Sequence, residues 1–500
     1  MRIRLLAILA FGLLCLPASA ASHWVEIRSP HFVVLTDADE ATGRRTAGQL
    51  ERMRAFFQSV LPNASNDADL PITVLALQDE NSFKSVIPAA YLAKGQARLA
   101  GFFSPMGDRN YITLETDLPL AHPYSVIYHE YTHFILRKDY WLPLWLNEGM
   151  AQYFENTDIN NSQISFGQPD FNQVRYLNQR MQLLPLPVLF KVDHRSPYYH
   201  EEDKISVFYI ESWALTHMLE TEDFQNKTQR IPEYNRRIAG GEDPVSAAQH
   251  AFGDLDALQK QLTAYVAQIG FQGIRLRMNF NIDDSTFKAS PISTDQADVV
   301  RADVLIHDGR AAEAKALVQP ILQRDPNNEL ALRDMAFITA AEHDQKGARK
   351  WLEQAADLDP QDCTANYYAA AFEYGDSAAS ATRETHLRRC VKFAPSFAPA
   401  YNDLADLLIT QNRNLDEAHM LSIQAVQLDP SSLTFRYAAA EALEAQHNPD
   451  SALMVLTEAK ARVARTPAQL AEIDKRIARL QQAQPAAPNP QPSASVAASH

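Results

Sequence analysis

Residues 126–136 read VIYHEYTHFIL, which combines two histidines and a glutamate with apolar and aromatic residues. The apolar side chains predict a buried helix, and His129 and His133, four residues apart, would lie on one face of it. Two imidazoles on one helix face can reach a single metal ion, with Glu130 beside them. The same pattern arises by chance in a chain of this length on the order of a few per cent of the time, so the two histidines alone do not exclude ordinary core residues.

A second helix pattern follows closely. Residues 144–155 read LWLNEGMAQYFE, with fourteen residues between His133 and Glu148. A catalytic zinc ion takes three protein ligands and keeps a fourth position for water. His129, His133 and Glu148 are therefore the candidate ligands of one Zn²⁺ per chain. Glu155, seven residues after Glu148, either accepts a hydrogen bond from a ligand histidine or is a solvated helix residue, and we expect the second.

Together the two motifs resemble the gluzincin metallopeptidases. L-W-L-N-E-G, followed by an apolar residue and Ala, is similar to the third-ligand helix of peptidase family M1, which also carries H-E-x-x-H upstream. The shorter spacing here places the chain nearer the compact peptidase MA-like domains of exported bacterial proteins, of the DUF1570 type. The resemblance covers roughly residues 124–219 and implies an α+β zincin-type catalytic domain.

The resemblance also implies a role for each motif residue. His129, His133 and Glu148 would bind the zinc ion. Glu130 would be the catalytic general base that takes a proton from the attacking water and returns it to the leaving amine.

A further catalytic residue is implied at FYIESWALTHML. Tyr209 aligns with the tyrosine that stabilises the oxyanion in family M1, and Met218 aligns with a methionine of the same helix. Glu211-Ser212 stand where that family has Lys-Gly, which puts the role of Tyr209 in doubt. The alternatives for the oxyanion donor are Tyr128, Tyr131 and a backbone N–H.

One absence bears on the substrate. Aminopeptidases of family M1 carry G-x-M-E-N upstream of H-E-x-x-H, and its glutamate holds the free amino terminus of the substrate. The corresponding region here reads GFFSPMGDRN and has no such glutamate. We therefore expect an endopeptidase with an open cleft, in which the strand around residues 111–113 pairs with an extended substrate.

Outside the motifs, the N-terminal half predicts an α+β domain with its strands first. The segments HWVEIRSPHFVVLTD and PITVLAL predict strands, ATGRRTAGQLERMRAFFQSVLP predicts a helix between them, and GFFSP and NYITLET predict a strand pair. A last strand at residues 273–283 is expected to close this domain. We place the domain at residues 21–285 and a linker at 286–294.

The C-terminal half is a repeat array. Four prolines recur at intervals of 34, 35 and 35 residues, at Pro326, Pro360, Pro395 and Pro430. This period is typical of a helical solenoid, and alanines at matching offsets let paired helices pack closely. The pattern resembles the tetratricopeptide repeat (TPR) family over residues 295–466, with about five repeats. The resemblance implies that the all-α array binds a protein partner.

The last repeat of a solenoid has an apolar face that must be covered. Residues 467–483 predict a capping helix that covers the last apolar face, and the Pro/Ala/Ser-rich residues 484–500 predict a disordered tail. In the third repeat, Cys363 and Cys390 either form a disulfide between the two helices or are two free buried thiols.

The first twenty residues, MRIRLLAILAFGLLCLPASA, predict a secretory signal peptide cleaved after Ala20. The mature protein is then expected in the periplasm or outside the cell. The net charge of −15 argues against a nucleic-acid partner. After the signal peptide, no stretch approaches the roughly 18 apolar residues that a membrane span needs.

These features predict an exported zinc metallopeptidase that acts on a protein or peptide substrate, with a TPR solenoid that recruits a protein. The alternative is a TPR scaffold whose zinc-binding module is inactive or structural. A zinc hydrolase that acts on a non-peptide bond is a third hypothesis.

Overall fold

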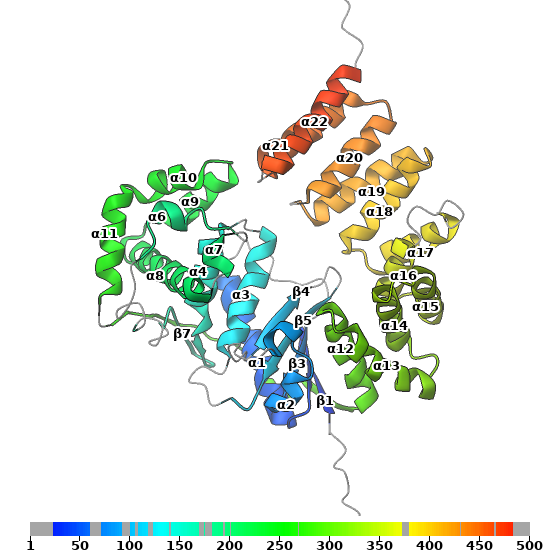
Figure 1. Ribbon diagram of the computed structural model, residues 1–500, viewed down its shortest axis with the longest axis horizontal. Helices are drawn as coiled ribbons and strands as arrows, with labels where there is room; N and C mark the ends of the chain where they lie inside the picture. Colours follow the sequence, from blue (N-terminus) through cyan, green and yellow to red (C-terminus); the bar gives the residue numbers. More distant parts are fainter. Residues whose placement is uncertain are drawn as a thin grey trace, which may run out of the picture.

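The computed structural model describes residues 24–60, 72–92, 101–105, 109–118, 124–139, 142–169, 175, 183–193, 196–200, 202–268, 270–372, 380–430, 432–464 and 467–483. The predicted signal peptide and the predicted C-terminal tail lie outside these residues. Figure 1 shows a lobe of mixed strands and helices, followed by an arc of paired helices. None of the helices in the described ranges is long and apolar enough to span a membrane.

The N-terminal lobe contains a six-stranded sheet in the order β4-β5-β3-β2-β1-β9. Strands β2, β3 and β5 are parallel to one another, and β4, β1 and β9 pair antiparallel with their neighbours. The strand bounds are β1 (Trp24–Arg28), β2 (Phe32–Thr36), β3 (Ile72–Leu77), β4 (Gly101–Pro105), β5 (Asn110–Glu115) and β9 (Lys288–Ile292). The expected strand pair is therefore β4 and β5.

Strand β5 lies inside the sheet, which corrects the prediction that residues 111–113 pair with a substrate. Ile112 is opposite Phe103 of β4 on one side and Val74 of β3 on the other. Both hydrogen-bonding edges of β5 are therefore used. Among the described residues, β4 pairs only with β5, so β4 is the edge strand.

The prediction of a linker at residues 286–294 is also wrong, because β9 lies within it. Strand β9 pairs antiparallel with β1, and Trp24 stands opposite Ile292. Its sequence KASPI reads as a linker because of Ser290 and Pro291. Proline is tolerated here because β9 is the other edge of the sheet, where one row of backbone groups needs no strand partner.

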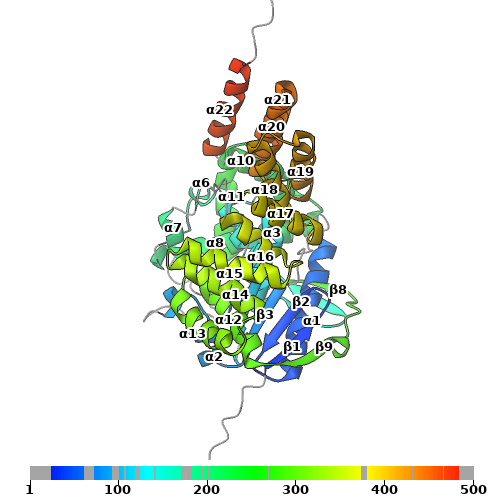
Figure 2. The same cartoon turned by 90° about the vertical axis from the view of Figure 1, so that its right-hand side faces the viewer.

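The sheet is covered on both faces. Helix α1 (Glu40–Val60) packs against one face with the larger core. On the other face, Trp24, Leu35 and Leu75 pack with residues of helix α2 (Glu80–Lys84) and helix α12 (Thr294–His307), including Ala297 and Val304. Figure 2 shows α12 beside this sheet. The first helix of the repeat array is thus part of the packing of the N-terminal lobe.

The rest of the lobe is mostly helical. Its helices are α3 (Ser125–Asp139), α4 (Leu144–Glu155), α6 (Leu186–Leu189), α7 (Pro197–His200), α8 (Glu202–Asn226), α9 (Arg230–Ala239), α10 (Pro244–Phe252) and α11 (Leu255–Val266). A second sheet consists of β6 (Asp158–Ile159), β7 (Gln163–Phe166) and β8 (Ile274–Arg277). The predicted strand at residues 273–283 is β8, which pairs with β7.

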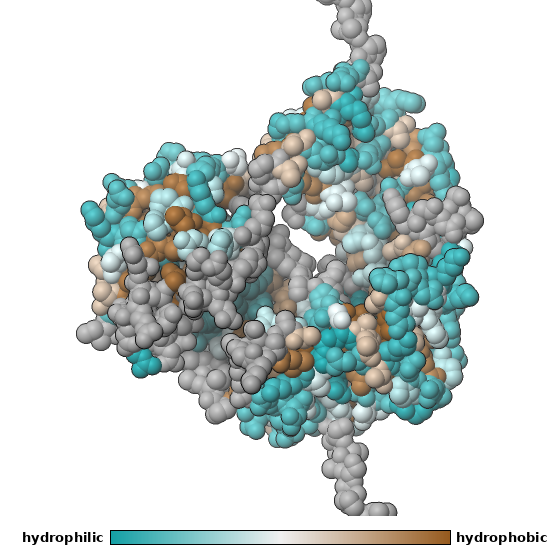
Figure 3. Space-filling model, viewed as in Figure 1, coloured by the Kyte–Doolittle hydropathy of each residue, from teal (hydrophilic) through white to brown (hydrophobic). Residues whose placement is uncertain are grey.

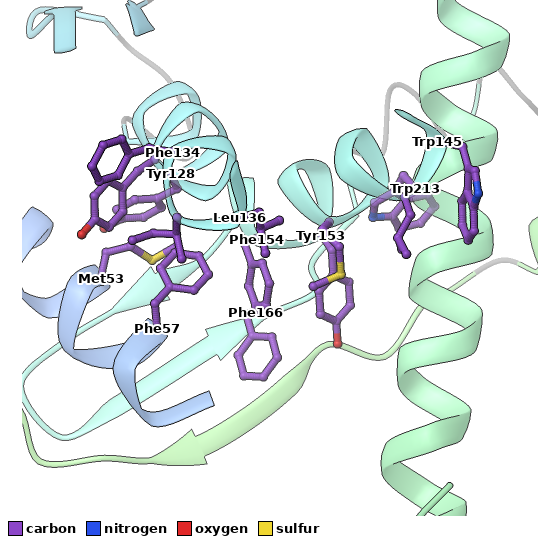
Figure 4. Close-up of a cluster of buried hydrophobic side chains, with 14 of the residues drawn as sticks. Met53, Phe57, Tyr128, Phe134, Leu136, Trp145, Tyr153, Phe154, Phe166 and Trp213 are labelled. Carbon is purple, nitrogen blue, oxygen red and sulfur yellow. The ribbon is translucent and has the colours of Figure 1, made fainter. Parts of the chain in front are cut away.

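An aromatic core joins these elements. Figure 4 shows Tyr128 and Phe134 of α3 turned toward Met53 and Phe57 of α1. The rings of Phe57 and Phe154, from α1 and α4, are 5.1 Å apart between centroids. The two helices that carry the H-E-x-x-H and N-E-G motifs are therefore fixed by one continuous core.

The described residues between 294 and 483 form a helical repeat solenoid. Its five helix pairs are α12 with α13 (Ala311–Arg324), α14 (Glu329–Ala341) with α15 (Gln345–Leu358), α16 (Cys363–Phe372) with α17 (Ser380–Phe393), α18 (Ala398–Thr410) with α19 (Leu415–Leu428), and α20 (Leu433–Ala445) with α21 (Pro449–Arg462). Alanines at equivalent positions, such as Ala302 and Ala336, are fully buried where the paired helices meet. A disulfide between Cys363 and Cys390 joins α16 to α17, with a Cα–Cα distance of 4.5 Å.

Helix α22 (Pro467–Ala483) follows the last pair. Ile473 and Leu480 are buried against residues of α20 and α21, so α22 covers the last apolar face of the solenoid. On the face shown in Figure 3, the molecule is hollowed between the N-terminal lobe and the arc of repeats. Hydrophilic residues dominate the surface of the arc in this view.

Candidate metal centre

Helix α3 is seated on the edge strand β4. The rings of Phe103 and Phe134 lie 5.4 Å apart between centroids, and Gly101 approaches Val126 closely enough that an added Cβ would lie 3.3 Å from its Cγ1. Ile127 and Ile135 are buried in the core. These contacts leave His129 and His133 on the side of α3 that faces α4.

Helix α4 is held by α8 at the glycine of the N-E-G motif. A Cβ on Gly149 would lie 2.5 Å from the carbonyl oxygen of Ser212 and would also collide with the hydroxyl of Thr216. Glycine is therefore required at this position because the two helix backbones approach closely. Since Gly149 follows Glu148 directly, this close contact with α8 also determines where Glu148 lies.

The three predicted ligands converge. The Nε2 atoms of His129 and His133 are 3.2 Å apart, and the Oε2 atom of Glu148 lies 3.8 Å and 3.5 Å from them. Zn–N and Zn–O distances of about 2.0–2.1 Å put tetrahedral ligand atoms about 3.3 Å apart. The donor set and its spacing therefore fit a zinc ion. Within the described ranges, this is the one group of three His, Cys, Asp or Glu side chains that could hold a metal ion.

Glu155 is not the solvated residue that we expected. Its Oε2 atom lies 3.1 Å from Nδ1 of His129, and only 17% of its side chain is exposed. When Nδ1 carries the proton and donates to Glu155, the lone pair of Nε2 points to the other two ligands. The sequence signal was the seven-residue spacing from Glu148, which places both glutamates on one face of α4.

The carboxylates also set the charge at the site. Burial lowers the pKa of His129, but the hydrogen bond to Glu155 and the charges of Glu155, Glu130 and Glu148 raise it above the usual value. Burial and the charge of Glu148 raise the pKa of Glu130, and His129 and His133 only partly offset this. Nδ1 of His133 is buried and has no hydrogen-bond partner among the described residues.

Tyr209 lies on α8 near the contact with α4. It is half-buried and stands one turn before Ser212, on the helix face that meets Gly149. Its role as the oxyanion donor stays a prediction. The alternatives Tyr128 and Tyr131 are buried in the core, and the hydroxyl of Tyr128 donates to Gln49 of α1.

The Lys-Gly position of family M1 has a different environment here. Glu211 is fully buried, and its Oε2 atom accepts a hydrogen bond of 2.7 Å from the backbone N–H of Leu184. Burial raises the pKa of Glu211 to about 8. This residue was not singled out as functional from the sequence, and no local pattern distinguishes it. Met218 is a buried core residue.

His217 is a core histidine of α8. It is fully buried, with Nε2 2.8 Å from the carbonyl oxygen of Gly167 and Nδ1 2.6 Å from the hydroxyl of Tyr265. Burial lowers the pKa of His217 to about 4. Trp145 and Trp213 are also core residues, whereas Trp141 and His194 lie outside the described residues.

A family model described as "Protein of unknown function (DUF1570)" matches residues 125–239. The match begins at the first residue of α3 and contains both motifs and Tyr209. No curated protein matches this chain.

Three solved repeat proteins are similar to the chain. MamA from Desulfovibrio magneticus RS-1 is 18% identical, with 38% of this chain and 96% of that chain covered and a TM-score of 0.29. YrrB, titled a TPR protein with an unusual peptide-binding site, is 17% identical, with 36% and 90% covered and a TM-score of 0.32. PilW, titled a type IV pilus biogenesis factor, is 16% identical, with 38% and 87% covered and a TM-score of 0.34.

Proposed function

We propose that the protein is an exported zinc-dependent metallopeptidase that cleaves internal peptide bonds. The observation that carries the proposal is the convergence of Nε2 of His129, Nε2 of His133 and Oε2 of Glu148 within 3.2–3.8 Å of one another. This donor set, with Glu130 beside it, is the set that a hydrolytic zinc ion uses. A purely structural zinc ion would not need Glu130.

In this proposal each residue of the site has a distinct role. When bound, zinc supplies a Lewis acid that polarises the scissile carbonyl and acidifies a water molecule. The carboxylate of Glu130 takes the proton of the attacking water and passes it to the leaving amine as the C–N bond breaks. Glu155 holds His129 in the tautomer whose Nε2 is free to bind. Tyr209 donates its hydroxyl to the oxyanion.

The substrate lies along β4 in this proposal. Strand β4 is the edge strand among the described residues and packs directly on α3 through Phe103 and Phe134. An extended peptide that pairs with a sheet edge gains backbone hydrogen bonds without dependence on its sequence. The absence of a glutamate from GFFSPMGDRN supports internal cleavage, because the family M1 glutamate is the residue that holds the free amino terminus in aminopeptidases.

The repeat array would recruit the protein substrate or hold the enzyme in an assembly. A solenoid presents an extended surface on which a partner chain can bind, which supports this part of the proposal. The first twenty residues support export to the periplasm or the medium.

A TPR scaffold with an inactive or structural zinc module is the second candidate. Its support is the departure at Glu211-Ser212, where family M1 has Lys-Gly beside the oxyanion tyrosine. A zinc hydrolase of another substrate class is the third, since a zinc site of this kind also serves other bonds.

Cleavage of defined peptides tests the proposal. We expect the zinc-loaded full chain to cut an amino-terminally blocked peptide as well as its unblocked form, to lose this activity with a chelator and to regain it with Zn²⁺. Glu130→Gln is the matched inactive variant, because it keeps the shape of the side chain. A strict requirement for a free amino terminus would contradict the endopeptidase assignment.

A further inference from the structure

The first two repeats contact the N-terminal lobe through the buried carboxylate of Asp303. Asp303 of α12 is fully buried and accepts two hydrogen bonds from Arg109, at 2.5 Å and 2.6 Å. The hydroxyl of Tyr111 donates to the same carboxylate at 2.5 Å, and Nη2 of Arg333 from α14 lies 3.3 Å away. One side chain of the array therefore binds Tyr111 of β5 and Arg109, which directly precedes β5.

Both residues belong to the hairpin that contains the edge strand β4. Arg109 directly precedes β5, and Tyr111 stands opposite Ser104 of β4 in the ladder. The guanidinium of Arg109 also lies 5.3 Å from the ring centroid of Phe337 on α14. The hairpin that contains β4 is therefore in contact with the first two repeats.

We propose that Asp303 is a positioning residue for the β4–β5 hairpin, so that the first two repeats are part of the unit that presents the edge strand. Two further contacts bind the array to the same lobe. Arg301 donates to the hydroxyl of Ser85 at 2.9 Å, and Arg310 donates to the carbonyl of Ile87 at 2.5 Å.

The burial of these charged groups explains why the Asp303 carboxylate would hold the hairpin in place. Arg109 and Arg333 are two positive charges that are mostly removed from water, and Asp303 pairs with both, whereas Asp334 lies 3.7 Å from Arg333. Removal of the Asp303 charge would take away the carboxylate that both arginines share and leave their mutual repulsion less compensated at a buried site, where the penalty is large. Movement of Arg109 toward solvent would reduce the repulsion between the two arginines, and the β4–β5 hairpin would move with it. The consequence for substrate binding rests on the proposed function.

Hydrogen–deuterium exchange on the zinc-loaded full chain tests the positioning role. In Asp303→Asn, we expect backbone amides of residues 101–104 and 110–115 to exchange about tenfold faster or more, because a hydrogen bond to a charged group is lost. Residues 125–155 should exchange as in the wild type, and zinc should stay at one per chain.

Asp295→Asn is the matched control. Asp295 is on the same helix and also accepts two hydrogen bonds from one arginine, Arg324, but this pair lies within the array. The control should leave the hairpin unchanged. Tyr111→Phe removes only one hydroxyl and decides the matter if Asp303→Asn does not fold, with a smaller increase expected at the same amides.

Unchanged exchange in the hairpin, or an equal increase in Asp295→Asn, would overturn the positioning role. Casein cleavage on the same samples separates this from the function. If the wild type cuts, Asp303→Asn should raise KM several-fold with kcat nearly unchanged, and an equal KM would contradict the proposal. If the wild type does not cut while the hairpin loosens as expected, the peptidase assignment fails and the positioning role stands.

Discussion

Replacement of Gly149 by alanine should disturb the metal centre through the contact between α4 and α8. The added Cβ would stand 2.5 Å from the carbonyl oxygen of Ser212, which is 0.9 Å short of the 3.4 Å at which ordinary contact begins. A backbone carbonyl cannot rotate away as a side chain can. The two helices must therefore separate, and Glu148 must move with α4.

The magnitude follows from two opposing effects. Overpacking of this kind costs about 1–3 kcal/mol of folding free energy. Alanine stabilises a helix interior by about 1 kcal/mol relative to glycine, so the net loss is up to about 2 kcal/mol. Displacement of one ligand should weaken zinc binding more clearly, by about 10–100-fold, which is the usual effect of disturbing a ligand's support.

Zinc affinity measured by chelator competition, together with denaturant unfolding, is the assay. Gly270→Ala is the control, because an added Cβ there meets no atom within 4 Å. Thr216→Ala in the Gly149→Ala background should restore part of the affinity, since it removes the hydroxyl contact and leaves the Ser212 carbonyl in place. Wild-type zinc affinity and stability in Gly149→Ala would refute the reasoning.

Three more changes have defined outcomes. Glu155→Ala should weaken zinc binding about 10–100-fold by chelator competition, whereas Glu155→Gln, whose amide oxygen still accepts from His129, should lose less; equal losses would exclude an orienting role. Tyr209→Phe should keep one zinc and lower peptide turnover about 10²-fold, and near-wild-type turnover would remove Tyr209 from the mechanism. The pKa of His217 is about 4 in the folded chain and 6.5 as the ordinary value, so the unfolded state takes the proton first as the pH falls. Stability from neutral His217 should be complete above pH 6.5 and decline toward pH 4, with about 2 kcal/mol lost by pH 5. Denaturant unfolding of the wild type at pH 7 and pH 5 measures this loss, and His217→Gln should flatten the difference; an equally steep profile in the variant would contradict it.

Local patterns predicted the elements and the ligand set. The four-residue spacing of His129 and His133 specifies one helix face without any knowledge of the fold. Most strands of the N-terminal lobe were also predicted from their short apolar segments. The 34- and 35-residue periods likewise predict helix pairs, because each repeat carries its own packing pattern. These features depend on residues close in sequence.

Features that depend on distant residues were missed. Trp24 pairs with Ile292, which is 268 residues later in the sequence, and the segment KASPI contains no local pattern that predicts a strand. The order of β4 and β5 in the sheet decides which one is the edge, and strand patterns do not contain that order. Glu155 reaches His129 across the contact between α3 and α4, two helices that pack in one core.

The zinc content of three purified proteins, the wild type, Glu130→Ala and Glu148→Ala, tests the central claim most directly when casein cleavage is measured on the same samples. We expect about one zinc per chain in the wild type and in Glu130→Ala, loss of zinc in Glu148→Ala, and cleavage by the wild type alone. Bound zinc without cleavage would favour the scaffold or a non-peptide substrate. Absence of zinc from the wild type after incubation with Zn²⁺ would contradict the metal centre itself.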